Sequence, residues 1–297
     1  MLIAIDGTGP GDSTSYWADN QSSHVVRVHR ESNERQKAYF RGPIWDGAGV
    51  SRIVSDARSW IQAAIANDPQ DLALTLVGHS RGALAVLLVA QELQRHTRQE
   101  GATSGRANQP GARQALSGAG VTLDSRQPWR QFGVTNLPTL ADVSIRCAGL
   151  FDCVDNYLSG DAKYVPSNIP FCFHAVRDPS VCSRPAFFND GLVAEDGRAT
   201  KLVLRYFSGT HAALGGTPWT GDHPTKSVPA RTAGGLVIGE VRNVPTITEA
   251  QDRTTSASVY AWMLACLVSA KAISSDPAVR DWNSKFTPCA NLNKLSR

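Results

Sequence analysis

The sequence lacks several features, and each absence argues against a class of protein. The longest apolar run, residues 259–270, is shorter than the about 20 residues that cross a bilayer, so we predict a buried helix there. No basic stretch with a following apolar run and cleavage site opens the chain, and we expect no signal peptide and no export by the general secretory route. The absence of any Lys/Arg cluster interleaved with aromatic residues argues against a nucleic-acid partner.

Ligand-binding motifs are also missing. No Cys-x-x-Cys pair occurs among the six cysteines, which argues against a structural zinc site. No Gly-Lys-Ser/Thr follows the glycine-rich residues 7–11, which argues against a phosphate-binding loop. We therefore expect neither a metal nor a cofactor. Cys172 with Cys182 and Cys266 with Cys289 are close enough in sequence to form disulfides, but buried thiols are an equal alternative.

The composition is that of an ordinary globular protein. The chain has 297 residues, of which 42% are hydrophobic and 19% charged, enough for one large α/β domain over residues 1–297. The formal net charge of +4 suits a protein that meets anionic lipid head groups. It suits enzymes with neutral substrates equally well, so the charge does not decide between them.

A Gly-x-Ser-x-Gly motif at residues 78–82 is the most informative feature. An apolar, β-prone run precedes it at residues 74–77, and a helical pattern follows at residues 84–90. Strand, sharp turn and helix are the context of a nucleophile elbow, in which the serine is held in a strained backbone conformation. We interpret Ser80 as the nucleophile; the alternative is a glycine-rich turn with an idle serine.

Strands alternate with helices along the chain. The patterns predict strands at residues 2–5, 24–28, 74–77, 143–151 and 202–207, and helices at residues 51–66 and 256–273. Loops are expected from Tyr39 to Gly49 and over about residues 215–235. Residues 97–136 are rich in Gly, Arg, Gln, Ser and Thr, which indicates an insertion or a lid loop over the active site. The alternation predicts a mostly parallel central sheet flanked by helices.

A catalytic serine needs a histidine base and a carboxylate that orients the histidine. Asp152 fits the role of the acid, because it directly follows the predicted strand at 143–151. Asp155 is a rival, and Asp178 and Asp190 are weaker ones. Each would otherwise be a capping or turn residue.

His211 fits the role of the base. It follows the predicted strand at 202–207, within a glycine-containing loop. His223, on the same loop, and His174, after another apolar run, are alternatives, and His174 could instead support the site. The remaining histidines precede the serine, lie inside the elbow or end the following helix: His24, His29, His79 and His96.

An oxyanion hole requires two backbone N–H groups directed at the developing charge. One is expected from Arg81, the residue after the nucleophile, and the other from Gly7 or Thr8, after the first strand. We expect Asp6 to brace this loop and to take no part in the chemistry.

Several motifs occur together in a fixed order. They are Ile-Asp-Gly-Thr-Gly (5–9), Tyr-Phe-x-Gly-Pro (39–43), Gly-His-Ser-Arg-Gly-Ala (78–83), Gly-Leu-Phe-Asp-x-Val (149–154), Phe-His-Ala-Val (173–176), Gly-Thr-His-x-x-x-Gly-Gly (209–216) and Trp-Met (262–263). In combination, the chain resembles the α/β-hydrolase family that includes the first class of type VI secretion lipase effectors, which are antibacterial phospholipases.

The resemblance implies an α/β-hydrolase-like fold with Ser80, Asp152 and His211 as catalytic triad and His174 in a supporting role. It also implies hydrolysis of phospholipid acyl esters, delivery by a secretion machine into a target cell's periplasm, residence in the producer's cytoplasm before that, and a cognate immunity protein as partner. The alternatives are a soluble carboxylesterase on small esters and a non-catalytic binding protein of the same fold.

Overall fold

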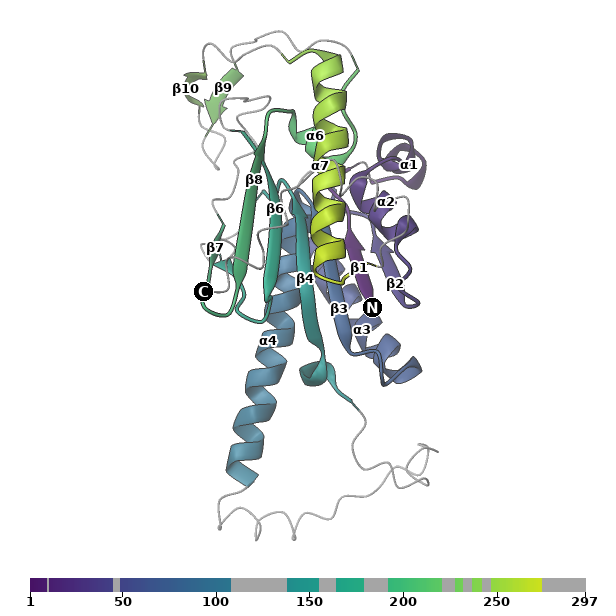
Figure 1. Cartoon of the computed structure of the whole chain (residues 1–297), viewed down its shortest axis with the longest axis vertical. Coiled ribbons are helices and arrows are strands. Elements are labelled where there is room, and N and C mark those ends of the chain that lie inside the picture. The colour runs from purple at the N-terminus through teal and green to yellow at the C-terminus, as the bar shows by residue number, and fades with distance from the viewer. Residues whose placement is uncertain are drawn as a thin grey trace.

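The structure is a computed structural model that describes residues 1–9, 11–44, 49–107, 138–154, 164–178, 192–220, 228–231, 237–241 and 247–273. Its centre is a six-stranded sheet in the order β2-β1-β3-β4-β6-β8, and all neighbouring strands are parallel (Figure 1). The strands are β1 (Leu2–Ile5), β2 (Lys37–Phe40), β3 (Ala73–His79), β4 (Ser144–Phe151), β6 (Phe171–Arg177) and β8 (Lys201–Phe207).

Helices cover both faces of this sheet. α3 (Val50–Asn67) and α4 (Arg81–Ala107) pack on one face, against Ile3 and Ile5 of β1. α2 (His24–Glu31) and α7 (Glu249–Ser269) pack on the other, against Leu2 and Ala4. Figure 1 shows α7 in front of the sheet and α4 behind it. Burial on both faces explains why the central strands are continuously apolar.

Smaller elements complete the described chain. They are α1 (Ser13–Asn20), the 3-10 helix η2 (Leu140–Asp142), α6 (His211–Gly215), the parallel pair β5 (Tyr164–Val165) with β7 (Val193–Ala194), and the antiparallel pair β9 (Val228–Arg231) with β10 (Val237–Val241). The order of strands reverses between β1 and β3, and in such sheets the functional site lies at the carboxyl ends of the strands near this point.

The predicted parallel sheet is present, but one predicted strand is wrong. Residues 24–28 belong to helix α2, which begins after Ser23, whose hydroxyl accepts a hydrogen bond from the Val26 N–H at 3.1 Å. The short apolar-polar alternation there also satisfies helical spacing, because His24, Val25 and Val28 are buried on the same side. The second strand is β2 instead, and Tyr39 and Phe40 are its last residues and not the start of a loop.

Two predicted helices extend further than expected. α7 begins at Glu249, where the side chain of Thr248 caps it, and not at residue 256. α4 continues to Ala107, so the predicted insertion at 97–136 begins as helix. Polar residues suit an exposed helix as well as a loop, which is why composition placed the boundary too early. Residues 108–137 lie outside the described residues, and the lid interpretation stays a prediction.

The predicted disulfides and the predicted loop at 215–235 also fall partly outside the described residues. Cys172 and Cys266 are buried, but Cys182 and Cys289 lie outside the described residues, so both disulfides stay predictions. Parts of the expected loop at 215–235 also lie outside, and its described part includes β9. Within the part of the chain that the structure describes, no helix combines the length and apolarity needed to cross a membrane.

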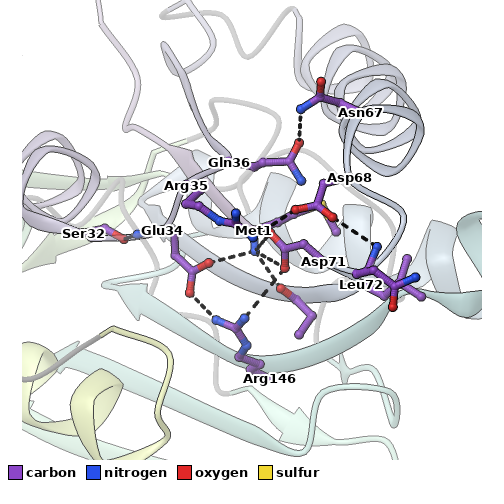
Figure 2. Close-up of polar contacts among 12 residues, drawn as sticks. Met1, Ser32, Glu34, Arg35, Gln36, Asn67, Asp68, Asp71, Leu72 and Arg146 are labelled. Atoms are coloured by element: carbon purple, nitrogen blue, oxygen red, sulfur yellow. Dashed lines mark hydrogen bonds and ion pairs between the residues drawn. The ribbon is translucent and has the colours of Figure 1, made fainter.

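An ion network holds the amino ends of the strands (Figure 2). The buried amine of Met1 lies 2.9 Å from Glu34 and 3.0 Å from Asp71, and it donates to the Ala73 carbonyl at 2.8 Å. Arg146 pairs with Glu34. The network therefore connects the starts of β1, β3 and β4, at the opposite end of the sheet from Ser80.

Candidate active site

Ser80 lies at the turn between β3 and α4. Its φ of +55° places it in the left-handed region, which a non-glycine residue rarely adopts. A Cβ atom at Gly78 would lie 2.6 Å from the Gly82 carbonyl oxygen, and one at Gly82 would lie 2.2 Å from the Asp6 carbonyl oxygen. Both positions therefore require glycine, and the arrangement is that of a nucleophile elbow.

The three side chains of the predicted triad lie together. His211 Nε2 is 2.9 Å from Ser80 Oγ, and His211 Nδ1 is 2.6 Å from Asp152 Oδ2. Asp152 is fully buried and Ser80 is 3% exposed, so little water reaches the acid or the hydroxyl. The carboxylate orients the ring so that Nε2 can accept the serine proton.

Asp152 follows β4 and is held on several sides. Its N–H donates to the Ala175 carbonyl at 2.7 Å, and its Oδ1 accepts the Arg177 N–H at 3.0 Å. Burial raises the pKa of Asp152, but the hydrogen bond from His211 and the nearby charges of His211 and Arg177 outweigh burial and leave the pKa below its ordinary value. The acid is therefore ionised at neutral pH.

His211 is the first residue of α6, directly after the loop that follows β8. Thr210 caps this helix, because its hydroxyl accepts the Ala213 N–H at 3.1 Å. The helix ends at Gly215, and the φ of +93° at the next residue, Gly216, suits glycine. A capped short helix after an edge strand thus presents the imidazole to the elbow.

The two rival residues that the structure describes, His174 and Asp178, form no hydrogen bond with Ser80. His174 is fully buried behind the acid, where its Nε2 accepts the Cys153 N–H at 3.0 Å, and burial lowers the pKa of His174 to about 4. Asp178 accepts the Ser208 hydroxyl at 3.3 Å at the neighbouring strand end. Asp155, Asp190 and His223 lie outside the described residues.

Asp6 is placed as a brace for the loop after β1. It is fully buried and accepts hydrogen bonds from the Gly7 N–H at 2.7 Å, the Ser23 hydroxyl at 2.5 Å and the Tyr39 hydroxyl at 2.9 Å. Burial raises the pKa of Asp6 to about 6, although these hydrogen bonds act in the opposite direction.

The same contacts correct one part of the predicted oxyanion hole. Because the Gly7 N–H donates to Asp6, it is not available to a developing oxyanion. Thr8 remains the candidate from this loop, and its hydroxyl is buried without a hydrogen-bond partner among the described residues. Arg81 directly follows the nucleophile and opens α4, so its N–H lies at the amino end of the helix, next to Ser80.

The sequence excluded His79 as the base but did not indicate that it contacts the base. Its ring lies against the His211 ring, with centroids 4.8 Å apart, and fits between Gly7 and Gly215. Burial, and then the charge of His211, lower the pKa of His79 to about 3, so it stays neutral beside the base. Its place inside the elbow motif puts it near the serine, but the sequence does not reveal the tilted contact between the two rings. Among the described residues, no group of three or more His, Cys, Asp or Glu side chains is arranged to hold a metal.

Comparisons with known proteins add neighbours of low identity. No protein-family model and no curated protein sequence matches the chain. Among solved structures, it is similar to the Tle1 effector bound to the VgrG spike from the Type 6 secretion system, with 14% identity, a TM-score of 0.37, and coverage of 72% of this chain and 50% of that one.

Two other structures are similar to a comparable degree. An uncharacterized protein from Pseudomonas aeruginosa shows 17% identity and a TM-score of 0.39, with coverage of 73% of this chain and 41% of that one. A cutinase-like protein from Cryptococcus sp. shows 13% identity and a TM-score of 0.30, with coverage of 68% and 74%. The chain thus spans about half the length of the Tle1 effector, and less of the Pseudomonas protein. The sheet order and the elbow on β3, taken from the structure itself, give the chain an α/β-hydrolase-like fold.

Proposed function

We propose that the protein is a serine hydrolase that cleaves carboxylic esters through an acyl-enzyme. One observation carries the proposal: His211 bridges Ser80 Oγ, at 2.9 Å, and the buried carboxylate of Asp152, at 2.6 Å. These are hydrogen-bond distances for a nucleophile, a general base and the group that orients the base. The left-handed backbone of Ser80 is a second, independent indication.

The chemistry follows from these contacts. His211 Nε2 takes the hydroxyl proton as Ser80 Oγ attacks the ester carbonyl carbon, and the carbonyl oxygen becomes an oxyanion that the Arg81 and Thr8 N–H groups stabilise. The intermediate collapses, the C–O bond breaks, and the alcohol leaves with the proton from His211. Water then loses a proton to His211 and attacks the acyl-serine, which releases the acid and restores the serine.

Asp152 favours the positive charge that His211 carries during these steps, and His79 does not oppose it. Asp152 stays ionised, because its pKa lies below the ordinary value. His79 stays neutral, because its pKa is lowered to about 3, and it therefore does not repel the imidazolium beside it.

Replacement of the nucleophile tests the proposal. We expect Ser80→Ala to lower ester hydrolysis by at least about several hundredfold and to abolish labelling by a serine-reactive phosphonate, while the circular dichroism spectrum stays that of the wild type. Ser59, on the exposed side of α3, supplies the matched control, because Ser59→Ala removes a hydroxyl remote from the site. Full esterase activity in Ser80→Ala would refute the mechanism. Absence of labelling and turnover in the wild type would favour the non-catalytic binding protein.

For the substrate, we propose acyl esters of phospholipids, on the strength of the sequence motifs. Two large apolar side chains support this choice. Trp17 on α1 is 37% exposed and Ile44, shortly after β2, is 40% exposed, and both follow strands whose carboxyl ends lie at the edge that carries Ser80. Aromatic and aliphatic side chains exposed at this edge of the sheet suit contact with a lipid aggregate.

An acyl-chain series separates this substrate from the alternative. A phospholipase should hydrolyse long-chain esters faster in dispersed aggregates than as monomers. A soluble carboxylesterase should prefer short chains in true solution, and this result would displace the lipid proposal. The bond within the phospholipid that is cut follows from the products of the same assay.

The sequence resemblance also leads us to propose delivery by a type VI secretion machine to the periplasm of a target cell, with an immunity protein as inhibitor in the producer. Expression with and without an added periplasmic leader tests this proposal. We expect toxicity only in the periplasm and only with Ser80 intact. Equal tolerance in both compartments would contradict it.

A further inference from the structure

A second buried carboxylate lies behind the base. Asp252, in the first turn of α7, is fully buried. Its Oδ1 accepts the Thr210 N–H at 2.7 Å, and its Oδ2 accepts the Thr210 hydroxyl at 2.8 Å and the Trp219 N–H at 3.3 Å. Within the described part of the chain, no Lys, Arg or His forms an ion pair with it. Three donors therefore satisfy a carboxylate that would otherwise be costly to bury.

These hydrogen bonds reach both sides of the short helix that carries the base. Thr210 immediately precedes His211 and is itself fully buried. Its hydroxyl donates to Asp252 and accepts from Ala213 at 3.1 Å, so the carboxylate orients the group that caps α6. Trp219 lies beyond the other end of α6. Asp252 thus connects the residues before and after α6 to the helix α7.

The packing around these bonds leaves little room for movement. A Cβ atom at Gly209 would lie 2.6 Å from a Thr255 methyl group and 3.4 Å from Asp252 Oδ1. The Thr255 hydroxyl donates to the Ser208 carbonyl at 3.0 Å. The loop before His211 therefore lies directly on α7 over several consecutive residues.

We propose that Asp252 is a positioning residue that holds the His211 ring between Ser80 and Asp152. The inference rests on the proposed ester hydrolysis. Asp252 does not contact the reacting atoms; it acts through Thr210 on the helix that carries the imidazole. Because the imidazole must meet two partners at 2.9 and 2.6 Å, a small displacement of α6 lengthens both hydrogen bonds. A displacement of about 1 Å in such a site can cost about 100-fold in rate.

Asp252→Asn tests the proposal, since it preserves shape but turns an NH₂ group toward N–H or O–H donors. We expect the rate of Ser80 acylation and kcat to fall about 10- to 100-fold with KM within about twofold of the wild type. The downfield proton resonance of the His211–Asp152 hydrogen bond should weaken or disappear. Thr210→Val removes one bond to Asp252 and also the acceptor of the Ala213 N–H, so it should show a loss of similar size, and Thr210→Ser should retain wild-type rates.

The matched control is Asp142→Asn. Asp142 is also a capping carboxylate, since it accepts the Thr139 N–H at 2.8 Å at the start of η2, but this helix precedes β4 and lies away from the triad. We expect this variant to lower thermal stability with an unchanged acylation rate. The double variant Asp252→Asn/Thr210→Val should lose less than the sum of the two single variants, because both changes remove the same hydrogen bond between Thr210 and Asp252.

The outcomes are distinct. If Asp252→Asn lowers the melting temperature as Asp142→Asn does, but keeps the wild-type kcat and proton resonance, Asp252 is merely structural and the inference is overturned. If the wild type shows neither turnover nor labelling of Ser80, the ester hydrolase proposal fails. The His211 resonance alone then decides whether Asp252 positions the ring.

Discussion

Ser80 and Asp152 both adopt left-handed backbone conformations, with φ of +55° and +43°. Each is held there by a hydrogen bond to the next strand: the Ser80 N–H donates to the Phe151 carbonyl at 3.0 Å, and the Asp152 N–H to the Ala175 carbonyl at 2.7 Å. A non-glycine residue in this region costs about 1–2 kcal/mol. The neighbouring strands therefore sustain the conformation of two members of the triad.

The strain at Ser80 leads to a stability prediction. Ser80→Gly should be more stable than Ser80→Ala by about 1 kcal/mol, because glycine adopts a positive φ without a steric penalty. Both variants lack the hydroxyl, so neither should hydrolyse esters. Urea unfolding at neutral pH measures the difference, and equal midpoints would show that the backbone at this position is relaxed.

Local sequence identified the three residues that the structure brings together, because each follows a strand and parallel strands end at one edge of a sheet. It did not identify the groups that hold them. Asp252 lies 42 residues after Thr210, and nothing near Asp252 indicates a partner on the β8 loop. The contact between His79 and His211 likewise depends on packing between distant segments. The catalytic roles of Ser80, Asp152 and His211 stay predictions until the variants are measured.

Most strands of the sheet were predictable from the sequence, including the short strand at residues 2–5, but β2, β6 and the helix α2 were not. The predicted strand at residues 143–151 became β4, and the helix at 51–66 became α3. β6 was not predicted as a strand, and residues 24–28 were misread, because a run of five to seven residues fits both a helical and an alternating pattern. Contacts with residues that are distant in the sequence then decide whether such a run forms a strand or a helix.

The close contact between Gly82 of α4 and the end of β1 leads to a stability prediction. Helix propensity alone favours Ala over Gly by up to about 1 kcal/mol, so Gly82→Ala would be stabilising in an isolated helix. Here a Cβ atom would lie 2.2 Å from the Asp6 carbonyl oxygen and 2.4 Å from that of Ile5. We expect the variant to be destabilised by about 1–3 kcal/mol.

Gly197→Ala is the control, because nothing lies within 4 Å of a Cβ atom at that position. It should change the unfolding midpoint little. If Gly82→Ala is as stable as the wild type, strand and helix have more room than the structure indicates.

Over the whole molecule, several buried groups titrate away from their ordinary ranges. Burial lowers the pKa of His24 and His79 to about 3 and that of His174 to about 4, whereas it raises the pKa of Asp6 to about 6. Near pH 5, the unfolded chain therefore binds a proton on each of these three histidines that the folded protein lacks. Asp6 acts in the opposite sense, because it is protonated in the folded state only.

These groups predict acid sensitivity. Their combined effect is two more protons on the unfolded chain, so these four groups together should lower the free energy of unfolding by about 2.7 kcal/mol per pH unit as the pH falls from roughly 6 to 4. Urea unfolding at a series of pH values measures the slope. His174→Gln removes one histidine and should reduce the slope by about 1.4 kcal/mol per pH unit. An unchanged slope would mean that His174 is charged in the folded protein.

The Met1–Glu34–Asp71 cluster and the triad occupy opposite ends of the same strands. Every residue assigned to the reaction follows a carboxyl end, whereas the cluster braces the amino ends (Figure 2). Thermal stability and catalytic rate can therefore be changed independently in this fold. A substitution of Arg146 should change heat tolerance and leave the chemistry as it is.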